Sequence, residues 1–258
     1  MRIKEKIINS LKTKNSKRTG RFQTLEEQEK VIKEKKFLKQ IYMEWYKELE
    51  KEISNFSEGA FVEIGSGGGF IKEVIPNVIT SDILFSPSLD INLSATMLPF
   101  KDSAVDIFFM VDALHHIQEP ILFLKEASRC LKSGGKIIMI EPANTAWSRF
   151  IYKNFHHEEF DPKTSWVVDG EDPLYSANGA IPWIIFFRDR DNFQKECPFL
   201  KVNKVKFHMP LRYLISGGLS VRQLLPTAAY GIVKALENIL MPFNKYIAMF
   251  QTIELEKL

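Results

Sequence analysis

The chain has 258 residues, of which 45% are apolar, so one α/β domain with additional segments fits its length better than two full domains. It contains no run of about 18 apolar residues and no N-terminal apolar segment before a cleavage site, so we expect a cytoplasmic protein without a transmembrane helix or signal peptide. The net charge of +3 hides a basic start, because residues 1–40 hold thirteen Lys and Arg against five Asp and Glu.

The first 57 residues are expected to form a basic arm followed by a helix, and residues 58–258 the main domain. Residues 1–24 are polar and irregular, whereas apolar residues recur at steps of three and four between 25 and 53, as on one face of a helix. The arm is either a contact for nucleic acid, anionic lipid or an acidic partner, or a plain solvated terminus.

The clearest signal is a glycine-rich turn after a short apolar strand. The strand at 60–62 precedes Glu-Ile-Gly-Ser-Gly-Gly-Gly at 63–69, and residues 70–75 can then open a helix. Glycines leave no Cβ in the way, so a nucleotide-like ligand can lie on the main chain. Seventeen residues after Gly65, a second short strand ends in Asp82, whose carboxylate can accept both hydroxyls of a ribose. The pattern therefore predicts a site for an adenosine-containing cofactor.

Strands and helices alternate along the rest of the domain. The expected strands lie at 60–62, 78–81, 89–91, 105–111, 136–140, 199–208 and 248–255. Helices are expected from Pro120 to Leu131 and near 230–240. This alternation predicts an α/β fold with a doubly wound, parallel sheet. Residues 143–198 are rich in aromatic residues and proline, and we expect them to form a substrate-side insertion over the carboxyl ends of the strands.

Six motifs occur in a fixed order between residues 58 and 142. They are Glu63-x-Gly65-x-Gly67-x-Gly69, Asp82, Leu98-Pro99-Phe100, Asp106, Leu114-His115-His116-Ile117 and Leu131-Lys132-x-Gly134-Gly135. This set resembles class I S-adenosylmethionine-dependent methyltransferases, and in particular the broad type 11 group. The resemblance implies a Rossmann-like, mostly parallel seven-stranded sheet with one antiparallel strand and helices on both faces. It also implies methyl transfer with S-adenosylmethionine as the cofactor.

The resemblance further implies a set of cofactor-binding residues. They are Glu63, Gly65, Ser66, Gly67, Gly69, Asp82, Ser94, Ala95 and Asp112. The glycines would line the methionine and ribose portion, Glu63 would face the amino group, and Asp82 would take the ribose hydroxyls. The sequence departs from the family at Ser94-Ala95, where an Asp-Ala pair often holds the adenine edge. Here the serine hydroxyl or the Ala95 amide would have to make that contact.

Methyl transfer from a sulfonium is an in-line displacement, so the protein mainly aligns the acceptor and excludes water. An acceptor oxygen usually needs a base. The candidates are His115 and His116 after the fourth strand, and His157 in the insertion. The alternative is that these histidines only pack and satisfy backbone groups. A metal site is conceivable at His156-His157-Glu158-Glu159, but none is expected, because adjacent histidines rarely reach one ion together.

The acceptor is expected to be a small or lipid-linked molecule. Apolar segments at 211–215, 224–226 and 239–243 predict either core packing or, with the basic arm, peripheral contact with a membrane. Nucleic acid is not expected, because Asp-Ala-Leu-His at 112–115 replaces the Asn-Pro-Pro-Tyr type of motif. Two other functions stay open: a nicotinamide-dependent oxidoreductase, disfavoured by the glycine spacing, and an inactive cofactor-binding scaffold.

Overall fold

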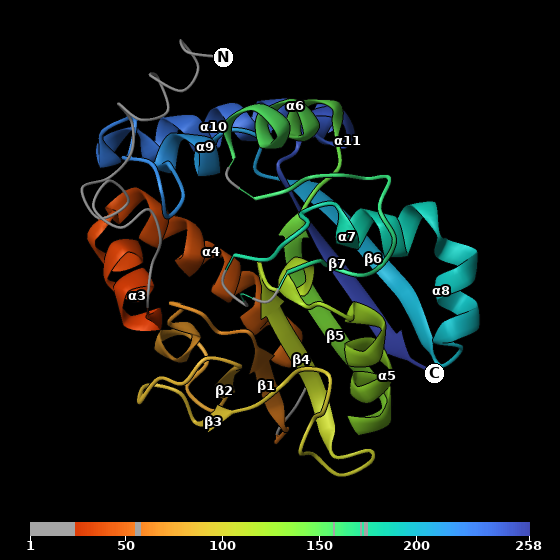
Figure 1. The fold of residues 1–258 in the computed structure, drawn as a ribbon. Helices are drawn as coiled ribbons and strands as arrows, with labels where there is room; N and C mark the ends of the chain where they lie inside the picture. Colours follow the sequence, from red (N-terminus) through yellow and green to blue (C-terminus); the bar gives the residue numbers. More distant parts are fainter. Residues whose placement is uncertain (1–23, 55–57, 157, 171, 173–174) are drawn as a thin grey trace.

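The computed structural model describes residues 24–258 apart from 55–57, 157, 171 and 173–174 (Figure 1). Its centre is a seven-stranded sheet in the order β3-β2-β1-β4-β5-β7-β6. The strands are β1 (Phe61–Ile64), β2 (Ile79–Asp82), β3 (Ile91–Asn92), β4 (Val105–Val111), β5 (Leu131–Pro142), β6 (Leu200–His208) and β7 (Phe250–Lys257). Strand β7 is antiparallel to β5 and β6, and the other neighbouring pairs are parallel. The predicted Rossmann-like sheet with one antiparallel strand is therefore confirmed.

The helix expected over 25–53 is present but broken into α3 (Leu25–Glu34) and α4 (Lys36–Ile53). The break lies at Lys35, whose backbone leaves the helical region and whose ammonium donates to the carbonyls of Gly218 and Val221. The apolar face of α4 is buried in the same core as the sheet. Residues 1–23 of the basic arm lie outside the described residues, so the arm and the boundary at residue 57 stay predictions.

The segment after the glycine turn does not form the expected helix over 70–75. It makes one 3₁₀ turn, Ile71–Glu73, before β2 begins. Pro76 has no N–H to continue a helix and disfavours helical geometry in the residue before it. At the start of the segment, the Phe70 N–H donates to the Tyr46 hydroxyl of α4 at 3.2 Å. Helix α4 thus packs where a longer helix after β1 was expected.

Helix α5 (Pro120–Cys130) agrees with its expected bounds, but β5 begins directly at Leu131, five residues earlier than expected.

The insertion expected over 143–198 has two different parts. Helix α6 (Ala146–Phe155) begins with a capping box of Thr145 and Ser148 and lies above the carboxyl ends of the strands. Residues 181–196 instead form α7 (Ile181–Trp183), a π turn (Ile184–Arg188) and α8 (Arg190–Glu196).

The helices α7 and α8 are a crossover connection between β5 and β6 and not part of a lid. Lys125 of α5 pairs with Glu196 of α8 at 2.7 Å, so the two helices lie side by side on one face of the sheet. Helix α4 crosses the other face, where its Glu52 pairs with Lys136 of β5 at 3.2 Å. Only the first part of the expected insertion therefore covers the strand ends, and the prediction was wrong for residues 181–196.

Three helices near the C-terminus join α6 above the sheet: α9 (Arg212–Ser216), α10 (Tyr230–Leu240) and α11 (Asn244–Ile247) (Figure 1). We call these four helices and their connections the lid. Short 3₁₀ turns lie at Leu114–His116, Thr227–Ala229 and Met241–Phe243.

A buried ion pair fixes the lid to α4. The Arg212 guanidinium donates to Glu237 of α10, to Glu44 of α4 at 2.6 Å and to the Tyr230 hydroxyl at 2.8 Å. Glu237 is buried and also accepts the N–H groups of Leu211 and Arg212. Removing one member of such a network leaves the other members buried without a partner.

We expect Glu237→Ala to lower the free energy of unfolding by about 3–5 kcal/mol, because the Arg212 charge and two N–H groups lose their acceptor. Chemical denaturation followed by circular dichroism measures this change. The matched control is Glu48→Ala, which breaks an exposed pair with Lys51 at 2.7 Å and is expected to cost less than about 1 kcal/mol. Equal losses for the two variants would show that the buried network does not hold the lid.

Candidate functional site

The functional site lies where the parallel strands β1, β2 and β4 end at the same edge of the sheet. Gly65, Asp82 and Asp112 follow or close these three strands, as the sequence analysis predicted. In open α/β sheets, ligands bind in the crevice outside the carboxyl ends of the strands.

The glycine turn begins with a backbone conformation that suits glycine. Gly65 has φ +69°, and a Cβ there would lie 2.8 Å from the Cβ of Ala113 in the loop after β4. Ser66 then joins the turn to β2, since its N–H donates to the Ser81 carbonyl at 2.9 Å and its hydroxyl accepts the Ser81 N–H at 3.2 Å. The turn is therefore held close to both neighbouring strands.

Asp82 closes the turn from the end of β2. One carboxylate oxygen accepts the N–H of Gly67 at 2.9 Å and the other accepts the N–H of Leu84 at 2.9 Å. Burial raises the pKa of Asp82, while these backbone donors oppose the rise. Each carboxylate oxygen can still accept another hydrogen bond. The side chain is therefore placed to take hydroxyl donors from a ligand on the turn.

Glu63 is the clearest sign that a ligand belongs here. Its side chain is 1% exposed, and its Oε2 atom has no hydrogen-bond partner among the described residues. Burial raises its pKa to about 8, with the Asp82 charge adding to the rise and the Ser66 hydroxyl opposing it. A buried acceptor without a donor costs about 1–3 kcal/mol. A ligand with an ammonium group would supply that donor, so the residues present fit S-adenosylmethionine.

The N-terminal helix α3 covers part of this turn, a contact that the sequence analysis did not foresee. The Gly68 N–H donates to the Gln28 side chain at 3.2 Å, and the Ser86 hydroxyl of the loop after β2 donates to Glu26 at 2.6 Å. Helix α4 packs against Gly69, because a Cβ on that glycine would collide with the Tyr46 hydroxyl. Gly69 thus contacts α4, although we expected it to line the cofactor.

The loop after β3 contains Ser94 and Ala95, the residues expected to contact the adenine. The Ser94 hydroxyl bonds to the Thr96 hydroxyl at 2.9 Å and accepts the Thr96 N–H at 3.4 Å, so it is engaged within its own loop. Ile83, directly after Asp82, is 53% exposed and Met97 is 75% exposed. Exposed apolar side chains at this place could cover a base. The sequence analysis did not select Ile83, because the spacing of residues in the sequence does not show which side chains are exposed. The roles of Ser94 and Ala95 stay predictions.

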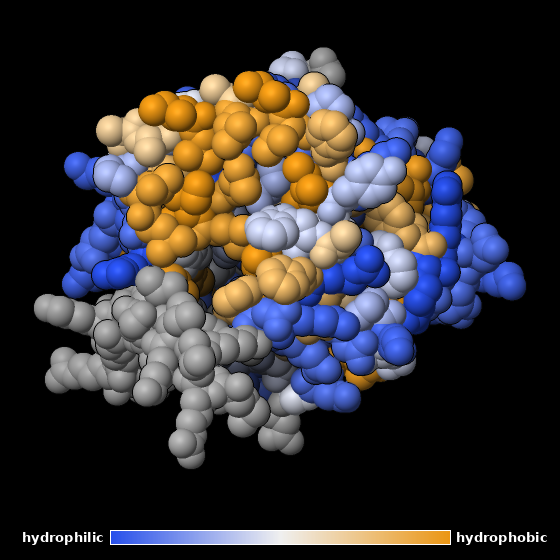
Figure 2. All heavy atoms as spheres, turned by 90° about the horizontal axis from the view of Figure 1, so that it is seen from above, coloured by the Kyte–Doolittle hydropathy of each residue, from blue (hydrophilic) through white to orange (hydrophobic). Residues whose placement is uncertain are grey.

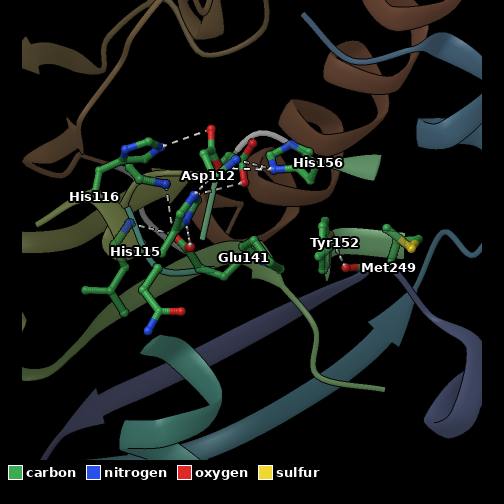
Figure 3. A network of polar contacts seen from close by, with 12 residues as sticks. Asp112, His115, His116, Glu141, Tyr152, His156 and Met249 are labelled. Atoms are coloured by element: carbon green, nitrogen blue, oxygen red, sulfur yellow. Dashed lines mark hydrogen bonds and ion pairs between the residues drawn. The ribbon is translucent and has the colours of Figure 1, made fainter. Parts of the chain in front are cut away.

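The loop after β4 is held by a second buried carboxylate, Glu141, at the end of β5. Its Oε1 accepts the N–H groups of Ala113 at 2.9 Å and Leu114 at 2.7 Å, and its Oε2 lies 2.7 Å from Nδ1 of His115 (Figure 3). Asp112 takes the left-handed conformation with φ +58°, and its N–H donates to the Ile140 carbonyl at 2.7 Å. The sequence signal for Glu141 is a polar residue closing a buried strand, the same signal that selected Glu63.

Three histidines surround one carboxylate from the insertion, Glu158. His115 Nε2 lies 3.5 Å and His116 Nε2 3.9 Å from its oxygens, and His156 Nδ1 lies 3.6 Å away. Figure 3 shows the rings of these three histidines turned toward one network. The predicted pair His115 and His116 is thus brought together with the insertion, whereas His157 lies outside the described residues.

The surroundings of the two neighbouring histidines shift their pKa values in opposite directions. Burial opposes a charge on His115, but Glu141, Glu158 and Asp112 raise its pKa well above the ordinary value. Burial and the charge of His115 lower the pKa of His116 to about 4. Burial would raise the pKa of Glu158, but the histidines around it hold that pKa well below its usual range. Burial raises the pKa of Asp112 to about 7.

A small pocket opens beside this network. Its lining includes Asp112, Glu158, Tyr152 of α6, Tyr213 of α9 and Phe250 of β7. The Tyr152 hydroxyl donates to the Met249 carbonyl at 2.8 Å, which fixes its ring as a wall. Among the aromatic residues of the segment 143–198, Tyr152 and Phe160 line this pocket. The indoles of Trp147 and Trp166 donate instead to Pro210 and Asp189.

Comparisons with known proteins agree with this geometry. Residues 62–139 match the family model described as a methyltransferase domain. A demethylmenaquinone methyltransferase of Streptomyces avermitilis is 28% identical over 92 residues, which cover 34% of this chain and 40% of that protein. The chain thus matches about two fifths of the length of this curated relative.

The fold is also found among solved structures. A possible histamine N-methyltransferase from Thermotoga maritima superposes with a TM-score of 0.51 and 18% identity, covering 89% of this chain and 97% of that one. At this identity, the likeness concerns the fold alone. The match of residues 62–139, the order of the sheet and the glycine turn with its two carboxylates lead to one conclusion: residues 62–139 belong to a methyltransferase domain, and the sheet around them has the fold of class I S-adenosylmethionine-dependent methyltransferases.

Proposed function

We propose that the protein transfers a methyl group from S-adenosylmethionine to a small or lipid-linked acceptor bound in the pocket below the lid. The observation that carries this proposal is the unpartnered Glu63 Oε2 beside the glycine turn. An acidic, buried acceptor beside a turn closed by Asp82 suits a ligand that has both an ammonium group and ribose hydroxyls. The cofactor, when bound, supplies an activated methyl group on a sulfonium.

The residues of this chain then have three tasks. Glu63 accepts the ammonium of the cofactor, and Asp82 accepts the ribose hydroxyls. Tyr152, Tyr213 and Phe250 exclude water from the pocket and pack against an apolar part of the acceptor. The cluster of His115, His116 and Glu158 binds the polar end of the acceptor, and His116, whose pKa is lowered to about 4, is the neutral imidazole that can accept a hydrogen bond from it.

The two alternative functions named in the sequence analysis are now supported to different degrees. The match of residues 62–139 to a methyltransferase domain and the antiparallel β7 between β5 and β6 argue against a nicotinamide-dependent oxidoreductase. An inactive scaffold would keep cofactor binding and lack turnover on every acceptor. Polar groups such as Asp112 and Glu158 line the pocket, although burying them costs free energy of desolvation. Their presence favours an enzyme over such a scaffold.

An exposed apolar surface on the lid favours a lipid-linked acceptor (Figure 2). Its members are Phe150 and Phe155 of α6, Leu224 and Leu225, Ile232, Leu236 and Ile239 of α10, and Met241, Phe243 and Tyr246. Ile232 is 76% and Ile239 73% exposed, so α10 turns an apolar stripe away from the core. Patches of this kind mark sites of contact with proteins or membranes.

The exposed charged residues of the lid itself are bases, of which Lys234 pairs with Glu44 of α4 at 2.7 Å. Between residues 209 and 249 the exposed charged residues are Arg222, Lys234 and Lys245, and the single acid of that segment, Glu237, is buried. Helix α6 adds Arg149 and Lys153 and has no acid. An apolar surface rimmed by bases complements an anionic bilayer, into which it can dip its apolar side chains. Within the described part of the chain, every helix is too short or too polar to span a membrane.

Asp82→Ala is expected to weaken S-adenosylhomocysteine binding by about 10- to 100-fold, because a charged acceptor of two hydroxyls is lost. Isothermal titration calorimetry measures the dissociation constant, beside NAD as a ligand that should not bind. The control is Asp102→Ala, an exposed carboxylate that pairs with Arg129 at 2.7 Å far from the glycine turn. Binding of NAD, or equal affinity in both variants, would contradict the cofactor site.

The affinity for S-adenosylhomocysteine is expected to rise with pH from about 6 to 8 and then level off. In the free protein, Glu63 has a pKa of about 8 and is protonated below it, whereas an ammonium ligand needs the carboxylate. Each pH unit below that pKa thus costs up to about tenfold in affinity. Glu63→Gln should bind more weakly at pH 8 and flatten this part of the profile. If the affinity of the variant still rises with pH in the same way, Glu63 does not bind the ammonium group.

The double variant Ile232→Glu with Ile239→Glu is expected to reduce partitioning onto phosphatidylglycerol vesicles by about 100-fold or more, because two apolar side chains no longer enter the bilayer. Vesicle co-sedimentation measures the partition coefficient. Phe199→Glu is the control, an equally apolar residue that is 63% exposed at the far end of β6. Absence of wild-type binding, or the same loss in the control, would refute a membrane-facing lid.

A further inference from the structure

His115, His116 and Glu158 form a compact group of ligand-type atoms outside the glycine turn. One atom from each residue lies within 4.8 Å of the other two. Adjacent histidines on a regular helix or strand usually point apart. Here the pair lies on the 3₁₀ turn Leu114–His116, their ring centroids are 4.4 Å apart, and both Nε2 atoms face the same carboxylate.

The other nitrogen of each ring is already fixed. His115 Nδ1 lies 2.7 Å from Glu141 Oε2, and His116 Nδ1 lies 3.2 Å from the Ser176 carbonyl. A histidine that binds a metal through Nε2 almost always donates its Nδ1–H to a carboxylate or a backbone carbonyl. The two histidines show one of each kind, which leaves both Nε2 atoms facing the same point. An ion bound there would displace the proton of His115, since metal binding to histidine releases protons.

The separations fit an ion better than they fit a direct pair. His115 Nε2 lies 3.5 Å and His116 Nε2 3.9 Å from Glu158 oxygens, whereas His115 Nδ1 and Glu141 meet at 2.7 Å. Charge-assisted N–H···O bonds are about 2.7–2.9 Å long. Two ligands that each bind an ion at about 2.0–2.2 Å lie roughly 3–4 Å from one another. Asp112 Oδ1, 3.9 Å from His115 Nε2, is within the same range.

We propose that His115 Nε2, His116 Nε2 and a Glu158 oxygen bind one divalent transition-metal ion, with Asp112 able to add a fourth ligand. Two imidazoles with carboxylates suit Zn²⁺, Fe²⁺, Co²⁺ or Mn²⁺ and not Mg²⁺ or Ca²⁺, which prefer oxygen ligands throughout. Glu141 is then the positioning residue that orients His115.

The position of the ion beside the pocket would allow it to take part in methyl transfer. Asp112 and Glu158 both line the pocket, so a hydroxyl acceptor held there would reach the ion. Coordination lowers the pKa of a hydroxyl, which releases its proton to solvent water. The oxygen would then form its bond to the methyl carbon while the carbon–sulfur bond breaks and sulfur keeps the electron pair. This use rests on the proposed function, whereas the metal site itself does not.

The test is metal uptake by the full-length protein. After treatment with a chelator and dialysis, we expect one Zn²⁺ or Co²⁺ per chain by mass spectrometry of the metal, and no comparable uptake of Mg²⁺. His116→Gln and Glu158→Gln should weaken metal affinity by more than 100-fold, and Glu141→Gln by about 10- to 100-fold. His208→Gln is the control, since His208 bonds to Thr252 on β7 outside the cluster.

A second measurement needs no variant and so does not depend on folding of the mutants. X-ray absorption at the zinc edge of the wild-type protein should show about two imidazoles with oxygen ligands. Uptake that is equal in all variants, or a spectrum with no imidazole, would overturn the site. S-adenosylhomocysteine affinity serves as the separate readout: it should be kept in Glu158→Gln, and its loss in the wild type would refute the proposed function but not the metal site.

Discussion

A single buried carboxylate, Glu141, determines the shape of the loop on which the acceptor side of the site depends. It is fully buried at the end of β5, yet it has three donors: two backbone N–H groups of the neighbouring loop and the His115 ring. Those bonds repay the cost of burying a charge and leave the loop with little freedom. The left-handed Asp112, the orientation of His115 and the approach of Glu158 all follow from that one anchor.

The cofactor side and the acceptor side are held together by helices from opposite ends of the chain. Trp45 of α4 stacks on Tyr213 of the lid at 6.1 Å and meets Phe250 of β7 at 5.0 Å. Arg212 joins the same two regions by charge. Two side chains that line the pocket, Tyr213 of the lid and Phe250 of the sheet, are therefore supported from behind by an N-terminal helix. An acceptor site of this kind depends on long-range packing, whereas the glycine turn is local to β1 and β2.

That difference explains how much the sequence could predict. The strands of the sheet and the places of Glu63, Asp82 and Asp112 follow from periodicity and from polar residues at strand ends, which are local signals. The antiparallel β7 was predicted only through the family resemblance. The absence of a helix after Gly69 and the position of α7 and α8 beside α5 depend on what packs against them. Glu141 closes a buried strand and could have been selected by the rule that found Glu63. The meeting of Glu158 with His115 joins distant segments, and spacing carries no information about it.

Helix α3 touches both borders of the glycine turn, through Gln28 to Gly68 and through Glu26 to Ser86. A cofactor on the turn would thus have α3 as a neighbour. Lys35, where α3 ends and α4 begins, is held by lid carbonyls, and burial lowers its pKa to about 8. A cofactor that enters or leaves the glycine turn would therefore pass beside a helix that takes no part in the chemistry.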